Sequence, residues 1–498
     1  MKSKYLLIFA VFVFISWHLF YLDKYPIVDL DDACMAEPAW SYVNTGHFSA
    51  PSFEGCYGLE KSDIYHGRLY MLAIAPYLKI FGNGVYQSRL DSFLTGLFVL
   101  LLTYLLAVKF FSKKVALNSV VLLGLSGLFI ITAHRARQEM LLTFFILLSL
   151  YLFLSAVDKK SALNFYFSGL LAGLSADIHL NGVILPIMLT ALFIYEYRLQ
   201  FIKQKGFWLC MAGIATGLLW WVITHILLDP KLFFEQWNGF VMKEIGTPGA
   251  STGVNPFGIV LKELKRYTFW FWSTTGHRNM VELVLLVCGL AGFLFVPKTE
   301  NMPLHKRGVT VMLICIASWI VMFTLIVSQK APYYIFLFLP FVMILLAKGL
   351  ENLKPLFSKT VFLLLVLFYL TQTAFISMKY KDIDYTNYGR NVRQIIPVGS
   401  RVLADTALWF ALSEDNFYSE LTYSYYWRIT KNSLDSYLKE KNIEYIAFGK
   451  EQIGTFVMSD YFKNNYNLFA TVEDGFYGSG GMLTGAKSYT TEIYKRKN

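Results

Sequence analysis

The sequence predicts a polytopic α-helical membrane protein of about 11–13 transmembrane helices that ends in a small α/β domain. Three observations support this fold class. The chain is 55% hydrophobic and only 16% charged, whereas soluble domains average about 25% charged residues. Its apolar residues fall in long runs that match the roughly 30 Å hydrocarbon core of a bilayer. Its basic residues fall in short clusters between those runs. Together these features exclude a disordered chain and a conventional soluble enzyme.

The net charge of +11 does not indicate nucleic-acid binding. Basic residues that flank apolar runs are typical of membrane proteins, in which they set the orientation of the helices, whereas a nucleic-acid site needs a basic stripe on a polar domain. We therefore expect membrane lipids, and no nucleic acid, among the partners.

The first apolar run, from Tyr5 to Leu22, is predicted to be a retained helix. It ends in Trp17-His18-Leu19-Phe20-Tyr21-Leu22, whereas a cleaved signal peptide ends in small residues. Further spans are predicted at 90–111, 115–133, 140–157, 162–176, 182–196, 207–228, 281–296, 309–327, 333–347 and 360–377. The apolar segment 69–80 is too short to span and is predicted to be a re-entrant or interfacial helix.

The loops alternate in charge, which predicts the orientation. If Lys2 and Lys4 are cytoplasmic, the terminus and loops on that side carry sixteen basic residues, against three in the short loops opposite. Because basic residues stay on the cytoplasmic side, we expect a cytoplasmic N-terminus and an extracytoplasmic C-terminus.

This orientation divides the chain into two predicted domains. Residues 1–377 form a transmembrane domain with extracytoplasmic loops at 23–89 and 229–280, and residues 378–498 form the α/β domain. Short alternating patterns at 400–405, 434–439, 443–448 and 468–472 are typical of its strands and helices. In the first loop, Cys34 and Cys56 could form a disulfide if that loop is extracytoplasmic.

The topology gathers polar residues from distant segments on the outer face. They are Asp29, Asp31, Asp32 and Glu37, then Glu60, Lys61, Asp63, His66 and Arg68, then residues 134–139, Asp177, His179 and Asn181, then His277 and Arg278, and finally Lys330, Tyr333 and Tyr334. Carboxylates there could deprotonate a hydroxyl nucleophile, and cations could stabilise a leaving phosphate. Glu139 and His179 adjoin apolar helices, where charge is costly, which favours a functional role.

Simpler roles remain open for single residues. Asp29 or Asp32 could cap a helix suggested by residues 33–42, and Arg135 and Arg137 could extend to lipid headgroups. Tyr333 and Tyr334 could be interfacial aromatics. In residues 255–272, basic residues at helical spacing beside aromatic ones predict a helix in the interface, near lipid phosphates.

Several motifs resemble those of the C-type glycosyltransferases of the protein O-mannosyltransferase and aminoarabinose lipid A transferase group, glycosyltransferase family 39-like. Asp31-Asp32-Ala-Cys-Met-Ala-Glu37 resembles the acidic motif after the first helix, and Phe81-Gly82 with Arg89 is similar to the end of that loop. Arg137-Gln-Glu139 resembles the second acidic motif, and Lys330-Ala-Pro-Tyr-Tyr334 resembles the Lys–Tyr-Tyr motif. The chain departs from the family at Ala33-Cys34, where an arginine is usual, and at Ser62-Asp63, where Pro-Pro is usual.

The resemblance implies the C-type glycosyltransferase fold and the transfer of a sugar, with inversion, from a polyprenyl-phosphate donor to an extracytoplasmic lipid, glycan or protein hydroxyl. It places the catalytic base on Asp31, with Glu139 as the second catalytic carboxylate. The expected substrate-binding residues are Asp32, Lys61, Arg135, Arg137, His179, Lys330, Tyr333 and Tyr334. No cofactor is required, although Glu60 matches a position that is implicated in divalent-metal binding in some relatives. The charge of Asp32 beside Asp31 is expected to raise one pKa of the pair.

An alternative class is a multi-span transporter or flippase. Transporters usually show internal repeats and ionisable residues near the membrane midplane, whereas here no repeat is visible and the charges gather at one face. The transferase is therefore favoured. Residue usage is compatible with a bacterium, and the expected location is then its plasma membrane. The sequence does not identify the sugar or the acceptor.

Overall fold

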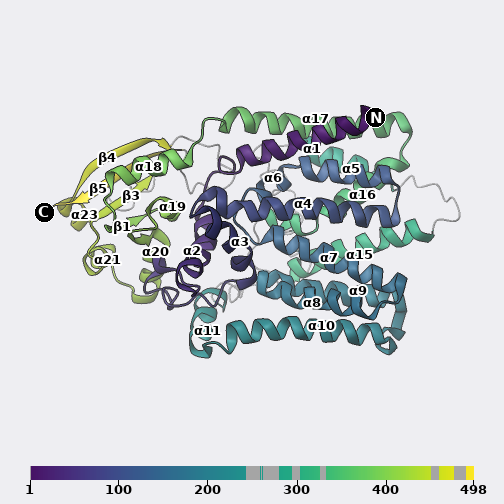
Figure 1. The fold of residues 1–498 in the computed structure, drawn as a ribbon, viewed down its shortest axis with the longest axis horizontal. Helices are drawn as coiled ribbons and strands as arrows, with labels where there is room; N and C mark the ends of the chain where they lie inside the picture. Colours follow the sequence, from purple (N-terminus) through teal and green to yellow (C-terminus); the bar gives the residue numbers. More distant parts are fainter. Residues whose placement is uncertain are drawn as a thin grey trace.

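The computed structural model describes residues 2–242, 258, 261, 280–293, 303–325, 332–449, 459–475 and 489–497. Its helices form an elongated bundle, and a small domain with a β-sheet lies at one end of that bundle (Figure 1). The predicted fold class, a multi-pass helical membrane protein with a C-terminal α/β domain, is confirmed.

The bundle consists of α1 (Lys2–Tyr21), α4 (Val85–Phe110), α5 (Lys113–Leu125), α6 (Gly127–Ala133), α7 (Glu139–Lys159), α8 (Ala162–Ile178), α9 (Ile184–Tyr197), α10 (Lys205–Trp221), α14 (Met280–Ala291), α15 (Pro303–Leu325), α16 (Leu339–Asn352) and α17 (Pro355–Tyr380). Within the described residues, six helical segments are long and apolar enough to cross a membrane, or seven if α5 and α6 count as one span. Because α8 and α16 have only 17 and 14 residues, the number of 11–13 spans stays a prediction.

The predicted span 115–133 is broken. Ser126 has extended backbone angles, and α5 and α6 meet there at 63°. Its hydroxyl donates to the carbonyl of Leu123 at 2.7 Å and accepts the N–H of Phe129 at 3.2 Å, so it satisfies polar groups at both helix ends.

Helices α8 and α10 pack closely through glycines. A Cβ on Gly173 would lie 2.3 Å from the carbonyl oxygen of Ile214, and one on Gly217 would lie 2.5 Å from the backbone nitrogen of Leu174. Small residues at such contacts let two membrane helices approach backbone to backbone.

Ion pairs join the helices at the end of the bundle that carries the N-terminus. Arg307 of α15 binds Asp158 of α7 at 2.8 Å and Glu196 of α9 at 2.7 Å, and Asp158 also pairs with Lys109 of α4. These groups belong to the basic loops that were predicted to be cytoplasmic. The α/β domain and the C-terminus lie at the opposite end of the molecule (Figure 1).

The loop 23–89, which was predicted to lie outside and is called the first outer loop below, folds over that opposite end (Figure 1). It contains α2 (Leu30–Thr45), the short helix η1 (Pro51–Phe53) and α3 (Arg68–Phe81). Helix α3 occupies the apolar segment that was predicted not to span, and it lies at the end of the bundle (Figure 1). Asp29 caps α2 by accepting the N–H of Asp31, as the capping interpretation expected.

The α/β domain contains a five-stranded sheet with the order β2-β1-β3-β5-β4. The strands are β1 (Arg401–Ala404), β2 (Asn416–Ser419), β3 (Tyr445–Gly449), β4 (Tyr466–Gly475) and β5 (Tyr489–Arg496). β1 pairs in parallel with β2 and β3, whereas β5 is antiparallel to β3 and β4. Its helices include α18 (Tyr385–Ile395), α19 (Trp409–Leu412), α20 (Glu420–Thr430), α21 (Leu434–Glu440) and α23 (Asp460–Asn465). The pattern at 434–439 is therefore a helix.

This domain contacts the first outer loop directly. The hydroxyl of Thr422 donates to the carbonyl of Ser52, and Lys441 lies 3.3 Å from Glu54. The suggested disulfide is absent, because Cys34 and Cys56 are both free thiols. Cys56 instead donates to the carbonyl of Thr422 at 3.7 Å, and its side chain packs in the cluster that joins the loop to the domain.

Candidate active site

Arg137 occupies the centre of a charged cluster where the bundle meets the first outer loop. It lies in the turn between α6 and α7, and its guanidinium donates to Glu139 at 2.9 Å and pairs with Asp31. One face of the guanidinium stacks on the ring of Tyr333, and the guanidinium carbon lies 3.9 Å from the ring centroid. One planar cation thus holds two carboxylates from segments about one hundred residues apart, which a guanidinium fork can do and an ammonium cannot.

The two carboxylates in this cluster differ in exposure. The side chain of Asp31 is 28% exposed and that of Glu139 only 2%. Asp31 is therefore the carboxylate that a molecule arriving from outside can reach, whereas Glu139 is positioned to hold Arg137.

A second ion pair sits beside the first. Arg135, two residues before Arg137, pairs with Asp29, the residue that caps α2. Burial raises the pKa of Asp29, and the guanidinium of Arg135 opposes that rise. The sequence indicated Asp29 both as an outer-face carboxylate and as a helix cap, and in the structure it caps α2 and pairs with Arg135.

Asp32 is fully buried against Arg89 of α4. The guanidinium of Arg89 donates to its two oxygens at 3.1 and 2.6 Å, and the N–H of Ala136 donates at 2.8 Å. Burial by itself would raise the pKa of Asp32, but these contacts outweigh it and lower the pKa below its ordinary value. The rise in pKa that was expected for one member of the Asp31–Asp32 pair therefore does not occur at Asp32, because Arg89 balances its charge. Arg137 is the partner of Asp31.

His179 and Tyr334 meet at the next helix end. His179 caps the C-terminus of α8, and its Nε2 lies 3.4 Å from the hydroxyl of Tyr334. Burial lowers the pKa of His179 to about 4, so its ring is neutral at pH 7. It is suited to hydrogen bonding and not to charge pairing.

A separate network fastens the outer loop to α8 and α10. Asp177 accepts from Trp220 at 2.8 Å, from the N–H of Arg68 at 3.1 Å, and lies 2.5 Å from His225. Asp63 in turn binds His66 at 2.7 Å. Both aspartates are fully buried. Asp177 joins the loop to the bundle, whereas the contact of Asp63 with His66 lies within the loop.

The remaining predicted residues lie apart from Arg137 or outside the described ranges. Lys61 is exposed, and its backbone N–H donates to the carbonyl of Gly58 at 3.0 Å. Glu60 accepts the N–H of Gly55 at 3.3 Å, and no group of three His, Cys, Asp or Glu side chains among the described residues could hold a metal ion. Lys330 and most of 229–280 lie outside the described residues.

The structure therefore joins Asp31, Arg137, Glu139 and Tyr333 directly, as the shared face predicted. Arg89 was noted only as part of a motif, although it is the partner of Asp32. The sequence signal that was available is an arginine directly before the predicted span 90–111, because a charge next to an apolar helix needs a partner.

The family comparison covers a central part of the chain. Residues 66–223 match the family described as dolichyl-phosphate-mannose-protein mannosyltransferase. Two relatives from Aquifex aeolicus (strain VF5), both described as uncharacterized proteins, are 31% identical over 214 residues and 28% identical over 236. These regions cover 41% and 46% of this chain and 40% and 49% of the relatives. The chain thus spans less than half the length of each relative.

Two solved structures are similar over nearly the whole chain. ArnT from Cupriavidus metallidurans bound to undecaprenyl phosphate covers 99% of this chain and 98% of its own length, with a TM-score of 0.65 and 12% identity. The Archaeoglobus fulgidus oligosaccharyltransferase tethered to an acceptor peptide covers 96% and 74%, with a TM-score of 0.52 and 13% identity. The chain therefore has the C-type glycosyltransferase fold. With the family match in residues 66–223, the predicted resemblance to this class is confirmed.

Proposed function

We propose that this protein is a membrane glycosyltransferase that moves a sugar from a polyprenyl-phosphate donor to a hydroxyl of an extracytoplasmic acceptor. The observation that carries the proposal is the cluster in which Arg137 joins Asp31, Glu139 and Tyr333 at one end of the bundle. The family match and the fold support the same class of reaction.

In the proposed reaction, Asp31 is the general base. The acceptor oxygen attacks C1 of the donor sugar while its proton passes to the Asp31 carboxylate. The bond between C1 and the phosphate oxygen breaks, and polyprenyl phosphate leaves as an anion, so no general acid is needed. A single displacement inverts the configuration at C1, and Asp31 then releases the proton to water.

Arg137 stabilises the charge that grows on the leaving phosphate. A guanidinium binds two phosphate oxygens in parallel, and in a buried setting this charge-assisted contact is strong. Arg137 is 8% exposed and is held by Glu139 and the ring of Tyr333. We propose Arg135, His179 and Tyr334 as further donor-binding residues, and the motif resemblance adds Lys61 and Lys330 to them. No step requires a metal, and dependence on a divalent ion at Glu60 is testable with a chelator.

The test is sugar transfer by the purified full chain from radiolabelled polyprenyl-phosphate sugars to cell-envelope acceptors. Asp31→Asn keeps the shape and removes the basicity, so turnover should fall roughly 10²–10⁴-fold with donor binding nearly unchanged. Asp158→Asn is the matched control, because Asp158 is also ion-paired but lies at the opposite end of the bundle.

Two outcomes would contradict the proposal. Near-wild-type turnover in a folded Asp31→Asn protein would remove the base assignment, and Glu139 would be tested next. Movement of an intact lipid-linked substrate across a vesicle membrane, without transfer, would favour the transporter or flippase.

A further inference from the structure

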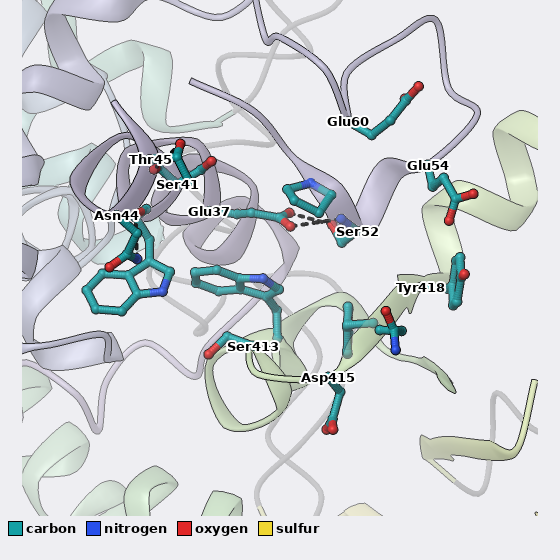
Figure 2. Close-up of a pocket in the computed structure, with 15 residues that line it drawn as sticks. Glu37, Ser41, Asn44, Thr45, Ser52, Glu54, Glu60, Ser413, Asp415 and Tyr418 are labelled. Carbon is teal, nitrogen blue, oxygen red and sulfur yellow. Dashed lines mark hydrogen bonds between the residues drawn. The ribbon is translucent and has the colours of Figure 1, made fainter. Parts of the chain in front are cut away.

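A polar pocket lies between the first outer loop and the α/β domain, apart from the Arg137 cluster. Its cavity volume is about 320 Å³, and one wall comes from α2 and the segment around η1, the other from α19 and β2 (Figure 2). Its lining consists of Glu37, Trp40, Ser41, Asn44, Thr45, Pro51, Ser52, Glu54, Glu60, Trp409, Ser413, Asp415, Asn416, Phe417 and Tyr418.

The lining chemistry disfavours an anionic ligand. Four of these side chains are carboxylates, and none is lysine, arginine or histidine. Lys441 and Arg393 pair with Glu54 and Asp415, but neither cation is part of the lining, so a phosphate in the pocket would face carboxylates and neutral groups. The donor phosphate therefore belongs with Arg137, and this pocket receives something else.

The same lining suits a sugar ring. Trp40 and Trp409 supply flat apolar surfaces for the C–H face of a pyranose, while carboxylates, hydroxyls and the amides of Asn44 and Asn416 can bond its hydroxyls. A few polar groups around aromatic surface are typical of small-ligand sites.

The pocket walls are fixed before any ligand arrives. Glu37 accepts the N–H of Ser52 at 2.8 Å and also its hydroxyl (Figure 2). The bond from Thr422 to the carbonyl of Ser52 fastens η1 to the α/β domain. Glu37 lies six residues after Asp31 on the same helix, a rise of roughly 9 Å along the axis. Six residues also rotate the side chains by about 120° around the axis, so the pocket and the proposed base belong to one helix but face different sides of it. An acceptor held in the pocket would have to extend beyond the bound sugar to reach Asp31.

We propose that this pocket is the acceptor subsite and that it binds a hydroxyl-rich, non-anionic sugar of a carbohydrate acceptor. The inference rests on the proposed transferase function and narrows the acceptor, which otherwise could be a lipid, glycan or protein hydroxyl. The α/β domain thereby supplies half of the binding site for the acceptor.

The test measures binding and transfer separately. The full chain in detergent micelles is titrated with methyl mannoside, N-acetylglucosamine and glucosamine, and with mannose 6-phosphate, while saturation-transfer NMR reports contact. Trp40→Ala should weaken the best sugar roughly tenfold, because one stacking surface is lost. Trp208→Ala is the matched control, since Trp208 is 58% exposed on α10, away from the pocket. Asn416→Ala changes an exposed residue of the pocket and replaces Trp40→Ala as the test variant if Trp40→Ala does not fold.

We expect a saturation-transfer signal for the neutral and amino sugars and little signal for the phosphorylated one. The signal should be lost only in the two pocket variants. Equal binding by wild type, Trp40→Ala and Asn416→Ala, or binding by none of the sugars, would overturn the acceptor subsite. Asp31→Asn should retain sugar binding while losing transfer. Enzymatic sugar transfer without pocket-dependent binding would refute only the subsite and leave the transferase function unaffected. Pocket-dependent binding without enzymatic sugar transfer would refute the transferase function.

Discussion

Arg137 connects the two acidic motifs of this protein. It holds Asp31 from the first outer loop and Glu139 from the start of α7, and the ring of Tyr333 covers its face. In the absence of substrate its charge is already compensated. Binding of a phosphate would require Arg137 to share its donors between the phosphate and Asp31, which would free that carboxylate to accept a proton.

Arg137→Lys is predicted to lower turnover roughly 10²-fold and to weaken donor binding. Lysine keeps the charge but cannot bond two carboxylates and a phosphate in one plane. Steady-state transfer kinetics with varied donor concentration would measure both effects. Arg307→Lys, at the opposite end of the bundle, is the control. Unchanged turnover and donor KM in Arg137→Lys would show that only its charge matters.

Glu37 gives the protein a specific dependence of stability on pH. Burial raises the pKa of Glu37 to about 7 despite the bonds from Ser52 that favour its charged form. A raised pKa in the folded state means that the folded protein binds the proton more tightly than the unfolded chain. The resulting stabilisation is complete below the ordinary glutamate pKa and is lost as the pH rises through about 7.

Glu37→Gln should therefore gain thermal stability relative to wild type as the pH rises from 5 to 8. Glutamine cannot titrate, so the variant does not carry the cost of ionising a buried carboxyl. Thermal unfolding in detergent, followed by tryptophan fluorescence, would measure the difference. Glu414→Gln, an exposed position, is the control. A constant difference across this range would contradict the assignment.

At the scale of elements, α8 and α10 depend on glycines for their close contact. Gly173→Val is predicted to lower the unfolding temperature clearly, because the new Cβ would lie 2.3 Å from the Ile214 carbonyl and the helices would have to separate. Thermal unfolding of the purified protein would measure this. Leu163→Val also adds a β-branched residue to α8, but at a position that is 62% exposed, so it should cost little. Equal effects of the two substitutions would attribute the loss to helix propensity instead.

At the scale of the whole molecule, the two termini lie at opposite ends of the bundle (Figure 1). The end with the N-terminus carries Lys109, Arg307 and their acidic partners, and the other end carries the Arg137 cluster and the α/β domain. If the basic end is cytoplasmic, as the charge count predicts, the proposed active site faces outward.

Alkaline phosphatase fused after residue 498 should therefore be active, because it folds only outside the cytoplasm. A fluorescent protein that matures only in the cytoplasm should be dark at the same position and bright at the N-terminus. The reverse pattern at either terminus would contradict the predicted orientation and with it the outward-facing site.

The sequence by itself determined the class of protein and the C-type glycosyltransferase resemblance, and it predicted the membrane face on which the proposed active site lies. Apolar run length and loop charge are local properties, so they can be read without coordinates. The topology and the family resemblance together also grouped Asp31, Arg137, Glu139 and Tyr333, which are in contact in the structure. The break at Ser126 was missed, because serine is common inside membrane helices and only its backbone angles end α5.

Only the tertiary structure decided which charges are partners. Asp29, Asp31 and Asp32 are nearly adjacent in the chain, yet they bind Arg135, Arg137 and Arg89 respectively. Helix α2 points these neighbours in different directions, so one is a cap, one is accessible and one is buried. The pocket between α2 and the α/β domain likewise has no sequence signal, because its two walls come from segments more than three hundred residues apart. Packing of the domain onto the loop, through contacts such as Thr422 with Ser52, creates it.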